Sequence, residues 1–504
     1  MRTQYNSKKK IKKTKSTLPI DLPCQLTREF ASQLSSPVTD IINTSLQQHK
    51  YPTLWKHEWV VLAPKKKEPK CLEDLRKISC TSDFSKLYEG FLKEWILEDI
   101  KPNLDFSQYG NEAGTGTEHM LVAFIDKVLK LLDTTEGHAA VIAAMVDWRA
   151  AFDRQDPTLA IQKFLNLGLR SSLVQVLVSY LQERKMTVKY NQKTSRMHDL
   201  PGGGPQGTLI GGIEYSVQSN DNGDFLDDDM KYKYVDDMSI LEFLSLSGLL
   251  VDYDVLGHVP SDVGVDHMFL PSSEYSTQSY LNNISQWTSD NLMQLNEAKS
   301  SYMIFTRMEQ EFRSRLTLND IKLDQVHEVR LLGLLITDDL KWDSNMADIC
   351  KRAYARLSMI TKLKYVGVGN RDLVDIYCLF VRSLLEYCSV VWHSTLTLEQ
   401  SLDIERVQKT SMKIILGDQY PGYEVALEHC KLDTLKHRRE KRSLNFGLKA
   451  LKHPKHKLLF PLSTPDDHHL RQPEKFHVNF ARTSTYKKST VPYIQRLMNK
   501  HFTK

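Results

Sequence analysis

The sequence predicts a mixed α/β catalytic body that extends to about residue 340 and a helical part that follows it. Three observations lead to this fold class. The stretch HAAVIAAMVDW (138–148) is almost entirely apolar, as a strand buried on both faces of a sheet would be. The stretch YKYVDDMSIL (231–240) surrounds two acids with residues that favour strands, which predicts a hairpin. Beyond about residue 343 the apolar residues recur with helical spacing.

Local signals place the other elements of the α/β body. The segment 112–133 sets a Gly/Thr-rich turn before a helix whose apolar positions share one face. Asp156 followed by Pro157 is typical of a helix start, because Asp caps free backbone N–H groups and Pro suits the first turn. Further elements are expected as helices at roughly 171–184 and 275–294, and as strands at TVKYN (187–191), SYMIFT (301–306) and VRLLGLLI (329–336).

The composition excludes several classes of protein. With 504 residues, 41% hydrophobic and 26% charged, the chain can bury a sizeable core. It has no run of about 18 apolar residues and no hydrophobic N-terminal signal, so we expect an intracellular protein of the nucleus, the cytoplasm or both, with no membrane partner. Its seven cysteines include no C-x-x-C pair, which argues against a disulfide framework and a zinc finger. The sequence does not indicate which oligomeric state the protein has.

Positive charge is concentrated at two places, although the net charge is only +5. Residues 1–20 hold Arg2 and six lysines without an acid, and residues 436–457 hold nine Lys or Arg against Glu440 alone. Either run could follow a polyanion backbone, and the first could act as a nuclear address. Ordinary solvated surface is the alternative for each run taken alone.

Three carboxylates stand at predicted strand ends or turns. Asp147 ends the apolar strand, and Asp236 and Asp237 occupy the hairpin. If these elements are neighbours in one sheet, the acids converge on a site that can hold two Mg²⁺ ions about 3.5 to 4 Å apart. Such a site serves in-line phosphoryl transfer to a primer 3′-hydroxyl. An Asp-Asp pair alone is weak evidence, because the pair is common in surface turns.

The loop LPGGGPQGTLIGG (200–212) accompanies these acids. Its six glycines and two prolines surround one Gln, a composition that lets backbone approach a ligand closely. Phe152 follows Asp147 by five residues, which places an aromatic ring just past the proposed metal ligand, where it could press against a ribose.

Five stretches in this order resemble motifs A to E of reverse transcriptases, and most closely those of non-LTR retrotransposons. They are VDWRAAFD (146–153), GGGPQGTLIGG (202–212), YVDD (234–237), LNEAKSSYMIF (295–305) and RLLGLLITDDLKW (330–342). Upstream, 74–92 and 107–121 resemble the fingers segment of that family and the stretch after it, and 385–396 resembles its C-terminal region. The resemblance implies a right-hand polymerase fold with a basic tail at 1–20, fingers and palm at 21–340, and a helical thumb and basic C-terminal region at 341–504.

The resemblance also implies the roles of individual residues. Asp147, Asp236 and Asp237 would be the metal-binding triad for two Mg²⁺ ions, with Mn²⁺ as an alternative. Phe152 would exclude the 2′-hydroxyl of a ribonucleotide. The other implied positions are Gln206 and Gly207 against the incoming dNTP, Arg76 and Lys86 at its triphosphate, Lys299 as a proton donor to pyrophosphate, and Leu332 and Gly333 in the primer grip. For Lys86 and Lys299 an exposed, solvated lysine is the alternative.

The implied function is RNA-directed DNA synthesis from dNTPs on an RNA template with a DNA primer. Two departures from the family pattern stand out: Lys77 replaces a usual Pro, and the run DNGDFLDDD (221–229) adds acids that we interpret as a solvated loop. No endonuclease domain fits before residue 55 and no RNase H segment is evident, so we expect no nicking of target DNA and no RNA degradation. Two alternatives are a catalytically inactive retroelement-derived RNA-binding protein and an RNA-synthesising polymerase, which the ring at Phe152 disfavours.

Overall fold

The computed structural model describes residues 21–133, 139–191, 193–200, 202–245, 268–269, 277–308, 312–463 and 475–502. The predicted basic tail at 1–20 lies outside these residues. The chain forms two compact units, each of three segments. The first unit comprises 1–111, 147–226 and 280–296, and the second comprises 112–146, 227–279 and 297–504. Of the helices that the structure describes, none is both long and apolar enough to cross a membrane.

The first unit contains a five-stranded sheet in the order β2-β1-β4-β5, with β6 also paired to β4. β1 runs antiparallel to β2 and parallel to β4. The predicted strand at 187–191 is confirmed as part of β4. The strand bounds are β1 His57–Pro64, β2 Leu75–Cys80, β4 Lys185–Tyr190, β5 Lys193–Thr194 and β6 His198–Asp199.

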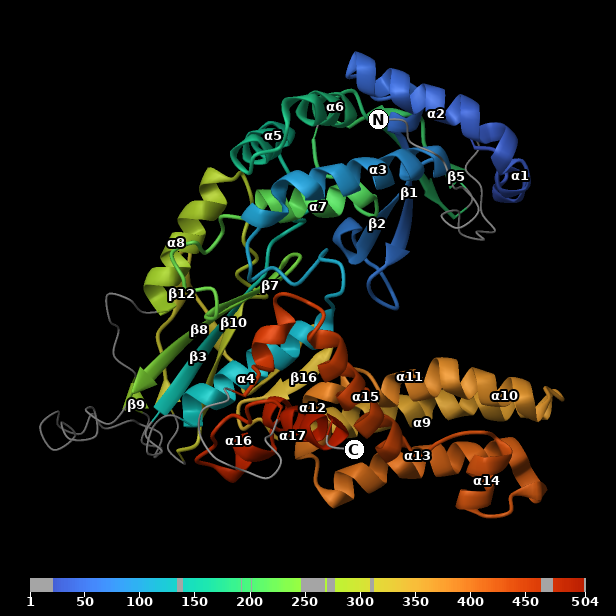
Figure 1. Ribbon diagram of the computed structural model, residues 1–504, viewed down its shortest axis with the longest axis vertical. Coiled ribbons are helices and arrows are strands. Elements are labelled where there is room, and N and C mark those ends of the chain that lie inside the picture. Colours follow the sequence, from blue (N-terminus) through green and yellow to red (C-terminus); the bar gives the residue numbers. More distant parts are fainter. Residues whose placement is uncertain are drawn as a thin grey trace, which may run out of the picture. The chain divides into compact units, whose positions relative to one another are not determined.

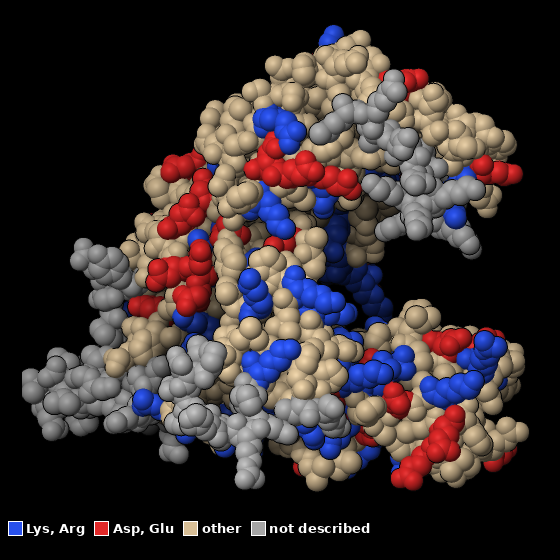
Figure 2. Space-filling model, viewed as in Figure 1, with Lys and Arg blue, Asp and Glu red and all other residues tan. Residues whose placement is uncertain are grey.

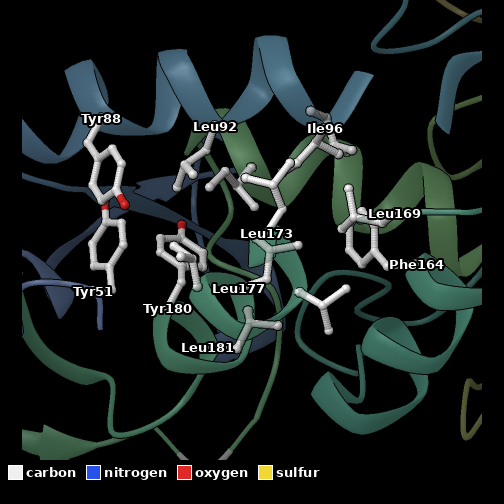
Figure 3. Close-up of a cluster of buried hydrophobic side chains, with 14 of the residues drawn as sticks. Tyr51, Tyr88, Leu92, Ile96, Phe164, Leu169, Leu173, Leu177, Tyr180 and Leu181 are labelled. Atoms are coloured by element: carbon white, nitrogen blue, oxygen red, sulfur yellow. The ribbon is translucent and has the colours of Figure 1, made fainter. Parts of the chain in front are cut away.

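Helices supply the core of the first unit. Aromatic and aliphatic side chains of α3, α5 and α6 interlock there, and Tyr51 stacks on Tyr88 with ring centroids 5.1 Å apart (Figure 3). Asp156 caps α5 as predicted, accepting hydrogen bonds from the N–H groups of Thr158 and Leu159. The helix bounds are α1 Cys24–Glu29, α2 Ala31–Gln48, α3 Asp83–Ile100, α5 Pro157–Asn166, α6 Ser171–Leu181, α7 Leu209–Gln218 and α8 Thr277–Asp290, whose first residues belong to the second unit.

The second unit is built on a sheet in the order β14-β10-β3-β8-β7 (Figure 1). The central strand β3 is buried at seven of its eight residues, as its apolar sequence predicted. β3 pairs antiparallel with both β8 and β10. The bounds are β3 Ala139–Val146, β7 Lys231–Tyr234, β8 Asp237–Ser245, β10 Ser301–Thr306 and β14 Asp324–Gln325.

Three short ladders complete the strands of the second unit. The segment predicted as one strand at 329–336 is in fact a hairpin, because Leu332 and Gly333 both take positive φ and reverse the chain. Period-two alternation is the same for one strand as for two, so the pattern could not locate the turn. The bounds are β9 Met268–Phe269 with β11 Phe312–Arg313, β12 Thr317–Leu318 with β13 Ile321–Lys322, and β15 Glu328–Leu331 with β16 Leu334–Thr337.

Helices dominate the second unit outside its strands. On α4 (Thr117–Asp133) the predicted apolar face is buried through Met120, Phe124, Val128 and Leu132. From residue 343 on, the described chain is almost wholly helical, so the predicted α/β body and helical C-terminal part are confirmed. The remaining bounds are α9 Asp343–Tyr365, α10 Asn370–Ile376, the π-helix η6 Tyr377–Arg382, α11 Ser383–Leu385, α12 Ser389–Trp392, α13 Leu398–Leu416, α14 Tyr423–His429, α15 Leu435–Ala450, α16 Ser484–Lys488 and α17 Thr490–Phe502.

Three histidines join the start of α4 to the segment after α15. The ring of His456 stacks on His119 and on His453, with centroids 4.1 and 4.3 Å away. Burial, together with the neighbouring imidazoles, lowers the pKa of His119 to about 4 and that of His456 to about 3. His119 and His456 are therefore neutral at physiological pH.

Acid should loosen this stack. An unfolded His has a pKa of about 6.5, so the unfolded chain binds more protons than the folded chain as pH falls from there toward 4, and stability falls with it. We expect the melting midpoint to drop less between about pH 7 and pH 5 in His456→Phe, which keeps a ring in the stack, than in the wild type. The exposed His437→Phe should behave as the wild type. An equal drop in all three proteins would contradict the prediction.

Candidate functional site

Asp147 directly follows β3 and is held by Asn296. The backbone carbonyl of Asp147 accepts a hydrogen bond from the N–H of Asn296 at 2.8 Å, and its carboxylate accepts one from the Asn296 side-chain amide at 2.7 Å. Two bonds to one residue fix both the backbone and the carboxylate. The sequence analysis did not single out Asn296, although it lies in the quoted stretch LNEAKSSYMIF.

Asp236 and Asp237 belong to a tight hairpin between β7 and β8. Tyr234 pairs with Asp237, so Val235 and Asp236 form a two-residue turn. Val235 takes φ +59°, a conformation that costs a β-branched residue free energy and that is usual for Gly. Strain of this kind gathers at functional sites.

The sheet register relates the two acid-bearing elements. Val146, the last residue of β3, pairs with Met238 of β8. Asp147 is the next residue in the chain after Val146, and Asp237 is the residue before Met238. Asp147 therefore follows, and Asp237 precedes, a residue of one pair in the sheet.

The donor chemistry of the three acids fits hard divalent cations, because carboxylate oxygens are the ligands that Mg²⁺ prefers. Within the part of the chain that the structure describes, no three His, Cys, Asp or Glu side chains are gathered closely enough to hold a metal ion.

Phe152 lies in the first unit and is held by a second ring. It stacks on Tyr215 of α7, with ring centroids 5.0 Å apart. Tyr215 is buried, so it gives the half-buried Phe152 a firm backing. The backbone carbonyl of Phe152 accepts a hydrogen bond from the N–H of Gly204 at 2.8 Å, which joins this segment to the Gly-rich loop.

Gln206 and Gly207 lie against the edge of β2. The carbonyl of Gln206 accepts a hydrogen bond from the N–H of Ser79 at 2.9 Å. Gly207 has φ +108°, a conformation that favours Gly, and a Cβ there would lie 3.2 Å from the Ser79 carbonyl oxygen and crowd the backbone. The loop is therefore fastened to the strand that carries Arg76.

The two predicted phosphate-contacting cations are exposed in the same unit. Arg76 lies on β2 opposite Ala63 of β1. Lys86 lies on α3 and pairs with Asp83 at 3.6 Å, an exposed ion pair of little energetic weight.

A buried acid accepts a hydrogen bond from the end of the Gly-rich loop. Glu89 of α3 accepts hydrogen bonds from the N–H of Leu209 at 2.9 Å and from the hydroxyl of Ser85 at 3.0 Å. Leu209 begins α7, so the carboxyl also meets the positive end of that helix. Sequence reasoning missed Glu89; an acid at an otherwise apolar position of a helix was the available signal.

The other predicted site residues lie in the second unit. Lys299 is exposed in the turn before β10. Leu332 and Gly333 form the tip of the β15–β16 hairpin with φ +47° and +85°, and the hydroxyl of Tyr387 donates to the Leu332 carbonyl at 2.6 Å. The tip is thereby held in place.

Four of the nine basic residues at 436–457 have acidic partners or are buried. Arg438 pairs with Glu386, Arg442 with Glu118 and Lys455 with Glu112. Arg439 is buried and donates to Ser401 and His393. The exposed members of the run are Lys436, Lys441, Lys449, Lys452 and Lys457. Figure 2 shows Lys and Arg side chains gathered over the region where Figure 1 labels α15.

No protein-family model matches the chain. Three curated proteins of Drosophila melanogaster are similar to it. The probable RNA-directed DNA polymerase from transposon BS is 24% identical over 64% of this chain and 34% of its own length. The probable RNA-directed DNA polymerase from transposon X-element is 21% identical over 78% and 41%, and the RNA-directed DNA polymerase from mobile element jockey is 26% identical over 36% and 20%.

These relatives are RNA-directed DNA polymerases of non-LTR retrotransposons. The resemblance predicted from the five motifs is thus confirmed, at modest identity. The chain spans 34% and 41% of the lengths of the transposon BS and X-element proteins.

Solved telomerase structures are more distant. Apo telomerase from Candida Tropicalis is 12% identical over 85% of this chain and 67% of that chain, with a TM-score of 0.40. Telomerase from Candida albicans with a fragment of telomeric RNA is 10% identical over 81% and 68%, with a TM-score of 0.38. Likeness at these TM-scores carries no inference about this chain.

Proposed function

We propose that this chain is an RNA-directed DNA polymerase that extends a DNA primer on an RNA template with dNTPs. The pairing of Val146 with Met238 carries the proposal, because it brings the ends of two acid-bearing elements to one paired position of a sheet. The named activity of the relatives supports the reaction class. No observation favours the alternative of an inactive RNA-binding protein.

In this proposal Asp147, Asp236 and Asp237 hold two Mg²⁺ ions, with Mn²⁺ as an alternative. When bound, the ions would make the primer 3′-hydroxyl more acidic and stabilise the leaving pyrophosphate. Asn296 would hold the Asp147 carboxylate in one orientation for this role.

The first unit binds the nucleotide in this proposal. Arg76 and Lys86 neutralise its triphosphate, for which exposed cations are suited. Gln206 and Gly207 approach it through the loop that β2 holds. Phe152, backed by Tyr215, presses on the sugar and excludes a 2′-hydroxyl.

Residues of the second unit complete the assignment. Lys299 gives a proton to pyrophosphate, and the tip at Leu332 and Gly333 contacts the primer. The exposed lysines of the run 436–457 hold the template or product backbone, a role for which their paired neighbours are less suited because those charges are already neutralised.

Removing one carboxylate should stop synthesis. We expect Asp236→Asn to lower primer extension on an RNA template on the order of 100-fold, because the variant loses a charge at which cations bind. Asp227→Asn makes the same change on an exposed acid of the neighbouring acidic run and should retain activity. Equal incorporation by the wild type and Asp236→Asn would refute the enzymatic proposal in favour of the inactive one.

Removing the aromatic ring at position 152 should weaken the preference for dNTPs over rNTPs. Phe152→Ala is expected to raise incorporation of rNTPs relative to dNTPs, since the side chain that excludes the 2′-hydroxyl is gone. Tyr215→Phe keeps the stacked ring and should keep the preference for dNTPs. The ratio of kcat/KM for the two nucleotides measures the effect, and an unchanged ratio in Phe152→Ala would remove Phe152 from this role.

The salt dependence of RNA binding tests the basic surface. Each lost phosphate contact lowers the slope of log K against log salt by about 0.7 to 0.9. A variant with Lys449, Lys452 and Lys457 changed to Gln should therefore lose about two units of slope. Lys455→Gln removes a buried, paired lysine of the same segment and should leave the slope unchanged. Identical slopes in all three proteins would contradict the assignment.

A further inference from the structure

Gly204 is packed so closely against one side chain that any Cβ at its position would displace the end of Gln155. An ideal Cβ there would lie 1.6 Å from Oε1 of Gln155 and 3.3 Å from Oε2 of Glu214. The two oxygens are therefore at most 4.9 Å apart, the sum of these distances. The φ of Gly204 lies outside the left-handed range, so the constraint at this position comes from space and not from backbone conformation.

Both neighbouring side chains are buried and lack hydrogen-bond partners. Gln155 is 2% exposed and Glu214 is fully buried, and all four of their side-chain oxygen and nitrogen atoms are without a partner. Buried polar groups are almost always hydrogen-bonded, to protein or to ordered water. Two such groups within 4.9 Å of each other can satisfy one another by a small shift or through one water.

The orientation of the Gln155 amide favours a neutral Glu214. The structure brings Oε1 of Gln155, an acceptor, to within 4.9 Å of Oε2 of Glu214, and a bond between these two oxygens needs a proton, which only the carboxyl can carry. Burial raises the pKa of Glu214 to about 7, against the opposing charge of Arg184. Arg184 is itself paired with Glu58 at 3.1 Å and lies over the ring of Tyr180, which also senses Glu89. Of these groups, Arg184 acts on Glu214 directly and favours its charged form.

The backbone around this pair leads to the nucleotide-facing loop. The N–H of Gly203 donates to the Gln155 carbonyl at 3.0 Å, and the N–H of Gly204 donates to the Phe152 carbonyl at 2.8 Å. Two residues beyond Gly204 stands Gln206, bonded to Ser79. A change beneath Gly204 therefore reaches both the ring at 152 and the loop at 206.

We propose that Glu214 and Gln155 form a buried clasp that holds Gly203 and Gly204 and thereby positions Phe152 and Gln206 for the incoming nucleotide. This inference rests on the proposed polymerase function. Glu214 is a positioning residue: it acts through the loop and touches no substrate. The clasp is closed while the Glu214 carboxyl is protonated. It opens as the pH rises through the pKa that this carboxyl has in the folded protein.

Steady-state primer extension tests the clasp through KM for dNTP. Glu214→Leu should raise KM about tenfold with a smaller change in kcat, because the loop is displaced while the acids at 147, 236 and 237 are not. Glu214→Gln keeps a donor without a charge, so its KM should stay near the wild-type value below neutral pH. Above neutral pH, KM for dNTP should rise in the wild type and stay unchanged in Glu214→Gln. An unchanged KM in Glu214→Leu would overturn the clasp.

A double-mutant cycle separates the clasp from the polymerase proposal. Gln155→Leu and Glu214→Leu should each lower the melting midpoint, and the double variant should lose less than the two losses combined, since neither polar group is left unpaired. Strict additivity would overturn the clasp even if the wild type extends primers. A wild type that fails to extend primers would refute the proposed function, while coupling in the cycle would still support the contact.

Discussion

The antiparallel pairing of β3 with β8 is the constraint on which the candidate site depends. Eight residue pairs run from Ala139 with Ser245 to Val146 with Met238. A slip of one residue would turn every side chain of a strand to the opposite face. β3 is apolar and buried on almost all of both faces, so a slip is costly because it would move large side chains such as Ile142 into the places of alanines in a closely packed core. The core thus places the strand ends that carry the acids, and Asn296 fixes the carboxylate of Asp147 in addition.

Much of this framework could be predicted because its signals are local. An unbroken apolar run, a helix cap at Asp156 and a one-sided apolar helix each lie within a few consecutive residues. The supporting contacts could not be predicted in the same way. Asn296 meets Asp147 across 149 residues, and Glu89 meets Leu209 across 120. Nothing in either segment alone names the partner, so only the fold reveals these contacts.

The charge that a surface presents to a ligand was the property that the sequence predicted least well. The sequence records that Arg438 and Arg442 are cationic, and the structure adds that each pairs with a Glu on another element. The acidic run 221–229 shows the converse. Asp229 pairs with Lys127, and Asp228 with Lys231 at 3.4 Å. A run of one sign is therefore not by itself a measure of the charge that a ligand meets, because folding neutralises part of it.

The turn that carries the paired acids illustrates how the sheet can impose a local conformation. Val235 at φ +59° costs on the order of 1 to 3 kcal/mol, which Gly would avoid. A two-stranded hairpin alone is marginally stable and would release this strain by fraying. β8 cannot fray in that way, because each of its eight residues after Asp237 is paired with a residue of β3. The strained turn, and with it the direction of Asp236, therefore persists only while the central sheet is intact.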